Sequence, residues 1–168
     1  HSYIFLADVL KQNNTPPGYP TDWGTHWTGS KNYTAVADYA MDQRIVGSST
    51  YGPQMLDALR SLPSISLVME IPDLFDKTTG IYSNPRNEGP ASERPMSIEI
   101  IHPRMGRHTQ ANGGVRIHGR ASRLPWKTPK HALRVKFNEG YGPNQLDADL
   151  FGLGAASEFD TLVLRSVF

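Results

Sequence analysis

Residues 104–137 read RMGRHTQANGGVRIHGRASRLPWKTPKHALRVKF, and the expectations for the whole chain start from this segment. It contains no acidic residue and nine basic ones: Arg104, Arg107, Arg116, Arg120, Arg123, Lys127, Lys130, Arg134 and Lys136. The other 8 of the 17 basic residues and all 16 acidic ones lie outside it, so a net charge of +1 combines a segment of +9 with a remainder of −8. Such an asymmetry predicts where an anionic partner binds.

Two runs within this segment, residues 115–120 and 133–137, alternate apolar and basic residues. This period of two is typical of strands with one buried face and one wet face. Residues 121–129 contain two prolines and are therefore expected to form a long loop between the strands. If the strands pair, one face becomes a cationic platform that carries Arg116, His118, Arg120, Arg134 and Lys136. The loop above it carries Ser122, Arg123, Lys127 and Lys130.

The alternative is that this face is only a solvated outer surface, because charged side chains are mostly exposed. A surface that serves solubility alone usually mixes both signs of charge. The absence of any acidic residue from the segment favours an anion-binding platform.

The composition is that of a globular domain with many turns. The chain has 168 residues, of which 38% are hydrophobic, enough for one domain with its own core. Its 13 prolines and 15 glycines predict short elements joined by turns. No apolar run is long enough to cross a membrane, and the absence of cysteine excludes disulfides and thiolate metal sites.

The periodic segments predict an α+β fold with a mostly antiparallel sheet of five or six strands and a few short helices. Besides the two basic strands, we expect strands at 64–70, 95–102 and 159–165, a helix at 52–63 and a helical turn at 72–76. Residues 3–11 fit a short helix or an entering strand, and 39–46 fit one helical turn before a strand. Residues 12–30 are expected to be a long loop. Residues 140–157 are expected to be rich in turns, with Leu150 and Phe151 as an anchor.

Three aromatic residues, Tyr19, Trp23 and Trp27, lie within the expected loop 12–30. Aromatic side chains can attach a long loop to the body of a domain, and they can also stack on sugars. We expect the first role and keep the second as the alternative.

Familiar motifs of catalysis and metal binding are not recognisable. The glycines around Gly113–Gly119 could let backbone amides approach a phosphate, although the spacing matches neither a Walker A loop nor a dinucleotide-binding fingerprint. His102 and His108 lack the spacing of a zinc site. Asp73 and Asp76 lack that of an EF-hand and are expected to cap the helical turn.

Nucleic acid is a further candidate partner, because a basic hairpin with Trp126 nearby could follow a phosphate backbone. The remainder of the chain is acidic, and aromatic residues do not alternate along the strands as a stacking platform would require. We therefore do not expect a nucleic-acid partner.

Several motifs in a fixed order, from about Leu62 to Arg165, resemble the CotH kinase-like family, which is named after a spore coat protein. The motifs are Ser61-Leu-Pro-Ser-Ile-Ser-Leu-Val68, Asp73-Leu-Phe-Asp-Lys-Thr-Thr-Gly-Ile-Tyr-Ser-Asn84, Glu93-Arg-Pro-Met-Ser-Ile-Glu99, Gly114-Val-Arg-Ile-His-Gly-Arg-Ala-Ser-Arg123, Pro129-Lys-His-Ala-Leu-Arg-Val-Lys-Phe137 and Tyr141-Gly142. The upstream residues, including Gly18-Tyr-Pro-Thr-Asp-Trp23 and Asp38-Tyr-Ala-Met-Asp42, resemble the leader that precedes this domain in large exported bacterial proteins.

The resemblance implies an atypical protein-kinase-like fold that binds ATP and Mg²⁺ and transfers a phosphoryl group to a protein. Residues 1–60 would be the leader packed on the body, and residues 61–168 the N-terminal, nucleotide-binding lobe. The expected nucleotide-binding residues are Arg116, His118, Arg120, Ser122, Arg123, Lys130 and Arg134, of which Arg116, Arg120 and Ser122 fall in an Arg-x-x-Gly-x-x-Ser type motif.

Family members carry their metal-binding and catalytic aspartates further along the chain. Because the sequence stops at Phe168, we expect those residues in a C-terminal lobe of a longer parent and expect this fragment alone to be inactive. The resemblance also implies an extracellular or cell-surface location in a bacterium. The competing interpretation is a non-catalytic surface module that recognises an acidic glycan or a partner protein through the same basic sheet.

Overall fold

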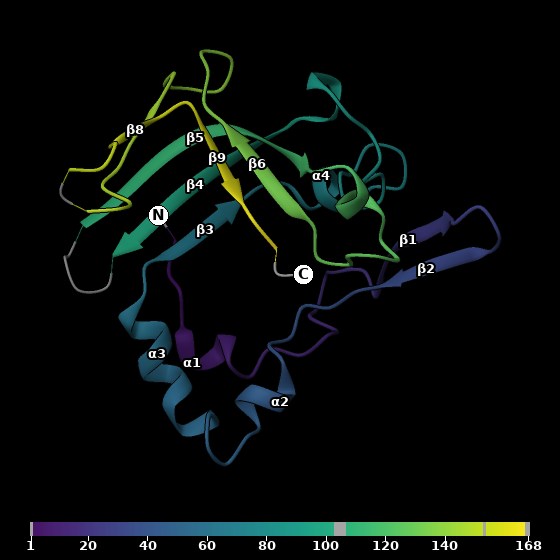
Figure 1. Ribbon diagram of the computed structural model, residues 1–168, viewed down its shortest axis with the longest axis horizontal. Coiled ribbons are helices and arrows are strands. Elements are labelled where there is room, and N and C mark those ends of the chain that lie inside the picture. The colour runs from purple at the N-terminus through teal and green to yellow at the C-terminus, as the bar shows by residue number, and fades with distance from the viewer. Residues whose placement is uncertain (1, 103–106, 153, 167–168) are drawn as a thin grey trace.

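The computed structural model describes residues 2–102, 107–152 and 154–166 (Figure 1). These residues form an α+β fold built on one five-stranded antiparallel sheet, with two small two-stranded sheets and several short helices. The expected fold class is therefore confirmed. The strands of the main sheet follow one another in chain order: β3 (Ser64–Val68), β4 (Arg94–His102), β5 (Arg107–His118), β6 (Ala132–Lys136) and β9 (Thr161–Leu164).

One face of the main sheet carries the hydrophobic core. The alternation in residues 95–102 places Met96, Ile98 and Ile100 on this face, and all three are buried, as their spacing predicts. The neighbouring strands contribute Val115 from β5 and Val135 from β6, which lie opposite each other in the register. The basic residues between these apolar ones consequently lie on the opposite face of the sheet.

The strand β5 differs from its expected bounds at both ends. It begins at Arg107 because residues 107–115 pair along the whole length of β4, so backbone pairing overrides the weak strand propensity of this polar, glycine-containing run. It ends at His118 because Gly119 has a φ of 111°, which turns the chain. The expectation that Arg120 belongs to the strand is therefore wrong.

The N-terminal region also contains strands that its proline and glycine content concealed. The expected loop at residues 12–30 is wrong, because β1 (Asp22–Trp27) and β2 (Asn32–Val36) form an antiparallel hairpin that projects away from the main sheet (Figure 1). Gly29, with a φ of 98°, lies in the turn between them. A strand expected after the helical turn near residue 46 is absent from the described residues.

The short helices lie close to their expected positions. They are α1 (Leu6–Val9), α2 (Gln43–Val46), α3 (Met55–Ser61) and α4 (Ile71–Phe75), and α3 continues a 3-10 turn at Gly52–Gln54. Figure 1 shows α1, α2 and α3 together to one side of the sheet. The expectation that Asp73 and Asp76 cap this helical turn is wrong, because Glu70 is the N-cap residue of α4 and no side chain makes a capping hydrogen bond there. The Asp76 carboxylate accepts hydrogen bonds from the backbone N–H groups of Thr78 and Thr79, both at 2.8 Å, and so shapes the turn after α4.

The segment at residues 140–157 is held by other residues than expected. Its short strand β7 (Leu146–Asp147) pairs with β8 (Glu158–Phe159), which follows the segment and precedes β9. Leu146 and Ala148 reach the core, whereas Phe151 is 72% exposed. The anchor is therefore Leu146, with Leu150 only partly buried against the same core.

An aromatic cluster attaches the N-terminal hairpin to the body. The buried Trp23 ring lies 5.0 Å from the ring of Tyr82 and 5.6 Å from that of Tyr39, and Phe75 of α4 completes the cluster. The Trp23 indole also donates a 3.0 Å hydrogen bond to the Tyr39 hydroxyl. Trp23 therefore has the attaching role expected for it, while Trp27 is 58% exposed.

Across residues 2–102, 107–152 and 154–166, none of the helices combines the length and the apolar character that a membrane span needs.

The packing around Ile98 predicts a large effect of truncation on stability. Ile98 is fully buried at the centre of the core face, so Ile98→Ala should lower the free energy of unfolding by about 2–5 kcal/mol. Val68→Ala is the matched control, because Val68 is 57% exposed on the neighbouring edge strand and its truncation should cost about 0.5 kcal/mol or less. Urea unfolding followed by circular dichroism measures both. Equal losses would contradict this assignment of the core.

Candidate functional site

The paired strands β5 and β6 bring basic side chains together on the face opposite the core. Arg116 and Arg134 lie directly across from each other in the register, and His118 follows Arg116 on the same face. This part of the expected cationic platform is present. We use the name arginine cluster for Arg116, His118 and Arg134 together with Arg165, which the next strand adds.

Arg165 was not among the residues expected at the site. Val163 of β9 pairs with Arg134 and Leu164 pairs with Leu133, so Arg165 follows on the same face as Val163 and reaches the row of His118. In the sequence, the alternation of Leu162 and Leu164 with Val163 and Arg165 indicates that Arg165 lies on the face opposite the core. That this face adjoins His118 follows only from the pairing of β9 with β6.

Arg134 has a buried hydrogen-bond donor, Nε, that makes no hydrogen bond in the described structure. Its Nε is shielded from solvent and has no hydrogen-bond partner. Within the described parts of the chain, no carboxylate forms an ion pair with Arg134 or Arg165. A buried donor without an acceptor costs free energy, and the charge of Arg134 is not neutralised by a carboxylate of the described residues.

Arg116 is held in place by Glu93. The two side chains form an ion pair at 3.9 Å, and both are largely buried. Tyr141 lies beside Glu93, and burial and the adjacent carboxylate raise the pKa of Tyr141. Gly114 makes room for this arrangement, because a Cβ there would lie 2.5 Å from both the Glu93 carboxylate and the Tyr141 ring. These contacts fix the direction in which Arg116 points.

His118 stands in a strongly positive environment. Burial lowers the pKa of its imidazole, and the charges of Arg134, Arg123, Arg165 and Arg116 lower it further. Four guanidinium groups therefore lie near one imidazole. In the described parts of the chain, the carboxylates that pair with members of this group are Glu93, on Arg116, and Glu88, on Arg123. The positive charge of the cluster thus exceeds the negative charge that pairs with it.

Two of the expected phosphate-binding residues are engaged in other contacts. Arg123 is buried and donates hydrogen bonds to the carbonyl oxygens of Gly119 (2.5 Å), Asn87 (2.9 Å) and Pro85 (3.1 Å). Lys130 forms an ion pair at 3.1 Å with Asp38 in the N-terminal region. Arg123 thereby holds the loop after β5 to the body, and Lys130 connects that loop to Asp38 in the N-terminal region.

The remaining expected residues lie at the margins of the cluster. Arg120 is exposed beyond the turn at Gly119. Ser122 is close to that turn, since a Cβ on Gly119 would collide with its Oγ. Lys136 is exposed on β6, opposite Gly114. The structure therefore brings Arg116, His118 and Arg134 together and leaves Arg120 outside the row of strand residues.

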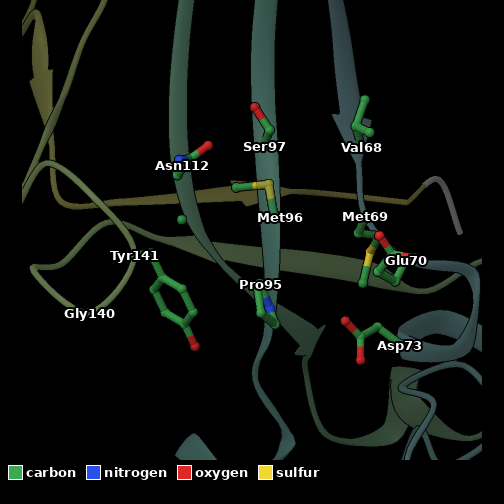
Figure 2. A pocket seen from close by; sticks show the side chains of 11 residues that line it. Val68, Met69, Glu70, Asp73, Pro95, Met96, Ser97, Asn112, Gly140 and Tyr141 are labelled. Atoms are coloured by element: carbon green, nitrogen blue, oxygen red, sulfur yellow. The ribbon is translucent and has the colours of Figure 1, made fainter.

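An open pocket of about 560 Å³ lies on the other side of Tyr141. Figure 2 shows Glu70 and Asp73 on one side of this pocket and the Tyr141 ring on the other, with Pro95 and Met96 between them. Carboxylates at its rim disfavour an anionic ligand. The Asp73 carboxylate at this rim forms an ion pair with Arg94 at 3.7 Å.

In the residues that the structure describes, no group of three or more histidine and acidic side chains is arranged to hold a metal ion. No family model, curated protein or solved structure matches this chain. Fold and site together define an α+β domain whose main sheet has an apolar core face and a cationic opposite face.

The buried histidine beside this site predicts a pH dependence of stability. His131 is packed against the Tyr82 ring at 5.4 Å and its Nδ1 makes a 3.0 Å hydrogen bond with the Ser122 carbonyl. Burial lowers the pKa of His131 below its ordinary value of 6.5 in the folded state. As the pH falls toward 6.5, this histidine becomes protonated in the unfolded chain while it stays neutral in the folded chain. The free energy of unfolding should therefore fall as the pH decreases from about 7.5 to about 5.5.

The contribution of His131 is limited to one proton, or about 1.4 kcal/mol per pH unit. His131→Asn retains an N–H donor near the position of Nδ1 and cannot titrate, so its stability should fall less over the same range. Urea unfolding at several pH values measures the difference. Parallel pH profiles for the two proteins would exclude a buried neutral His131.

Proposed function

We propose that this chain is the nucleotide-binding N-terminal lobe of a CotH-like atypical kinase and that the arginine cluster receives the phosphates of ATP. Two independent observations support the proposal. The ordered motifs between Leu62 and Arg165 resemble that family, and the motif residues Arg116 and Arg134 lie side by side on a cationic face.

The observation that carries the proposal is the position of Arg134, which lies opposite Arg116 in the register and forms no ion pair with a carboxylate of the described residues. A phosphoryl group offers three strong acceptor oxygens and up to two negative charges. Arginine binds such oxygens through charge-assisted hydrogen bonds, often two at once. Arg116, already oriented by Glu93, would supply a second guanidinium from the adjacent strand.

The residues present fit the phosphates of the nucleotide and not its magnesium ion. Mg²⁺ prefers carboxylate and phosphate oxygens, and the described residues offer no carboxylate cluster of that kind. Under this proposal the acidic residues that hold the metal belong to a C-terminal lobe of the parent protein. The role of this chain is then to position the phosphates and neutralise their charge, which is the main protein contribution in phosphoryl transfer.

The proposal retains the other implications of the family resemblance. The phosphoacceptor would be a protein, and the parent would be exported to the surface or exterior of a bacterium. The alternative function is a binding module that uses the same cationic face for an acidic glycan. The alternative is supported by the charge of the face but does not account for the order of the motifs.

Calorimetric titration of the purified chain with Mg-ATP tests the proposal. Arg134→Ala should weaken binding at least about ten-fold, because loss of one charge-assisted contact costs about 1.5–3 kcal/mol. Arg116→Ala should also weaken it. Arg60→Ala is the charge-matched control, since Arg60 is 62% exposed on α3 and pairs with Asp57, and it should leave the affinity unchanged.

Two results would contradict the nucleotide proposal. Equal affinity for Mg-ATP in the wild type and both cluster variants would remove the cluster from the binding site. Binding of a sulfated oligosaccharide, abolished by Arg134→Ala, with no detectable binding of Mg-ATP would favour the glycan-binding alternative.

A further inference from the structure

His118 is the only titratable group of the arginine cluster that can change charge near neutral pH, among the residues that the structure describes. It ends β5, and guanidinium groups approach it from four segments: Arg116 in its own strand, Arg134 in β6, Arg165 after β9 and Arg123 in the loop that follows. Among the described residues, no carboxylate forms an ion pair or a hydrogen bond with His118. Glu93 forms an ion pair with Arg116, and Glu88 forms one with Arg123.

We propose, on the basis of the phosphate-binding function above, that His118 takes up one proton when a doubly charged phosphate group enters the arginine cluster. The site then binds a dianion and a proton together, and His118 becomes a specificity-determining residue for the dianionic form. The proton comes from solvent and is held on an imidazole nitrogen, and no bond of the ligand forms or breaks.

A bound dianion lowers the positive charge around His118, so the imidazole is easier to protonate in the occupied cluster than in the empty one. In the empty site, burial and four neighbouring positive charges favour the neutral imidazole. A dianion among the same arginines adds two negative charges at short range and so favours the imidazolium. The protonated ring has N–H donors on both nitrogens, whereas the neutral ring has one, so protonation also adds a donor to the site.

The other buried histidine near the cluster cannot serve this purpose. His131 is buried, its Nδ1 is bonded to the Ser122 carbonyl, and its ring packs against Tyr82. His118 is only partly buried and lies on the same strand face as Arg116. It is therefore the histidine that a ligand on this face can reach.

Sulfate is the appropriate probe, because it remains doubly charged from pH 5.5 to pH 8 and any pH dependence then belongs to the protein. Titration calorimetry at pH 6 and pH 8, in buffers of different ionisation enthalpy, gives both the affinity and the number of protons taken up. For the wild type we expect tighter binding at pH 6, by up to about ten-fold per pH unit for one coupled proton, and net proton uptake around pH 7.

His118→Gln should bind sulfate with an affinity that does not change between these pH values and with no proton uptake. His131→Asn is the matched control and should retain the coupling of the wild type. Circular dichroism verifies that each variant is folded, and the buffer comparison on the wild type tests the coupling without any substitution.

The outcomes separate the two proposals. If sulfate and Mg-ATP both fail to bind the wild type, the phosphate-binding function is wrong and the coupling fails with it. If sulfate binds through Arg134 but without proton uptake, or with equal uptake in His118→Gln, the phosphate site stands and the role of His118 is overturned.

Discussion

The antiparallel register of β5 and β6 sets both the hydrophobic core on one face of the sheet and the cationic surface on the other. Val115 lies opposite Val135 on the buried side, and Arg116 lies opposite Arg134 on the other. Because side chains alternate across a strand, burial of the valines forces the two arginines into the same row. A shift of the register by one residue would bury the charges and expose the core, so the apolar packing stabilises the repulsive arrangement of the arginines.

That repulsion is only partly offset inside the protein. Glu93 pairs with Arg116 and Glu88 with Arg123, whereas Arg134 keeps a buried donor without an acceptor. Like charges in directly opposite positions of a sheet are unfavourable. This imbalance is local to one end of three strands, which makes the arginine cluster the part of the surface best suited to an anion.

Much of the sheet was predictable because its apolar periodicity is strong. Met96, Ile98 and Ile100 identified both β4 and its buried face, and the valines of β5 and β6 did the same for their strands. The hairpin β1–β2 was missed because its apolar residues serve a small aromatic cluster instead of an alternating face. The first half of β5 was missed because residues 107–114 contain few strand formers and owe their conformation to pairing with β4.

The sequence by itself determined the charge segregation, the fold class and the neighbourhood of Arg116 and Arg134, since all three follow from local composition and a period of two. Only the tertiary structure decided which cations are available. In the folded chain, Arg123 binds carbonyl oxygens and Glu88, and Lys130 pairs with Asp38. The pairing of β9 with β6 places Arg165 in the row of His118. The physical reason is that an ion pair or a strand contact between residues far apart in the chain depends on how the chain folds back on itself, and no local pattern records that.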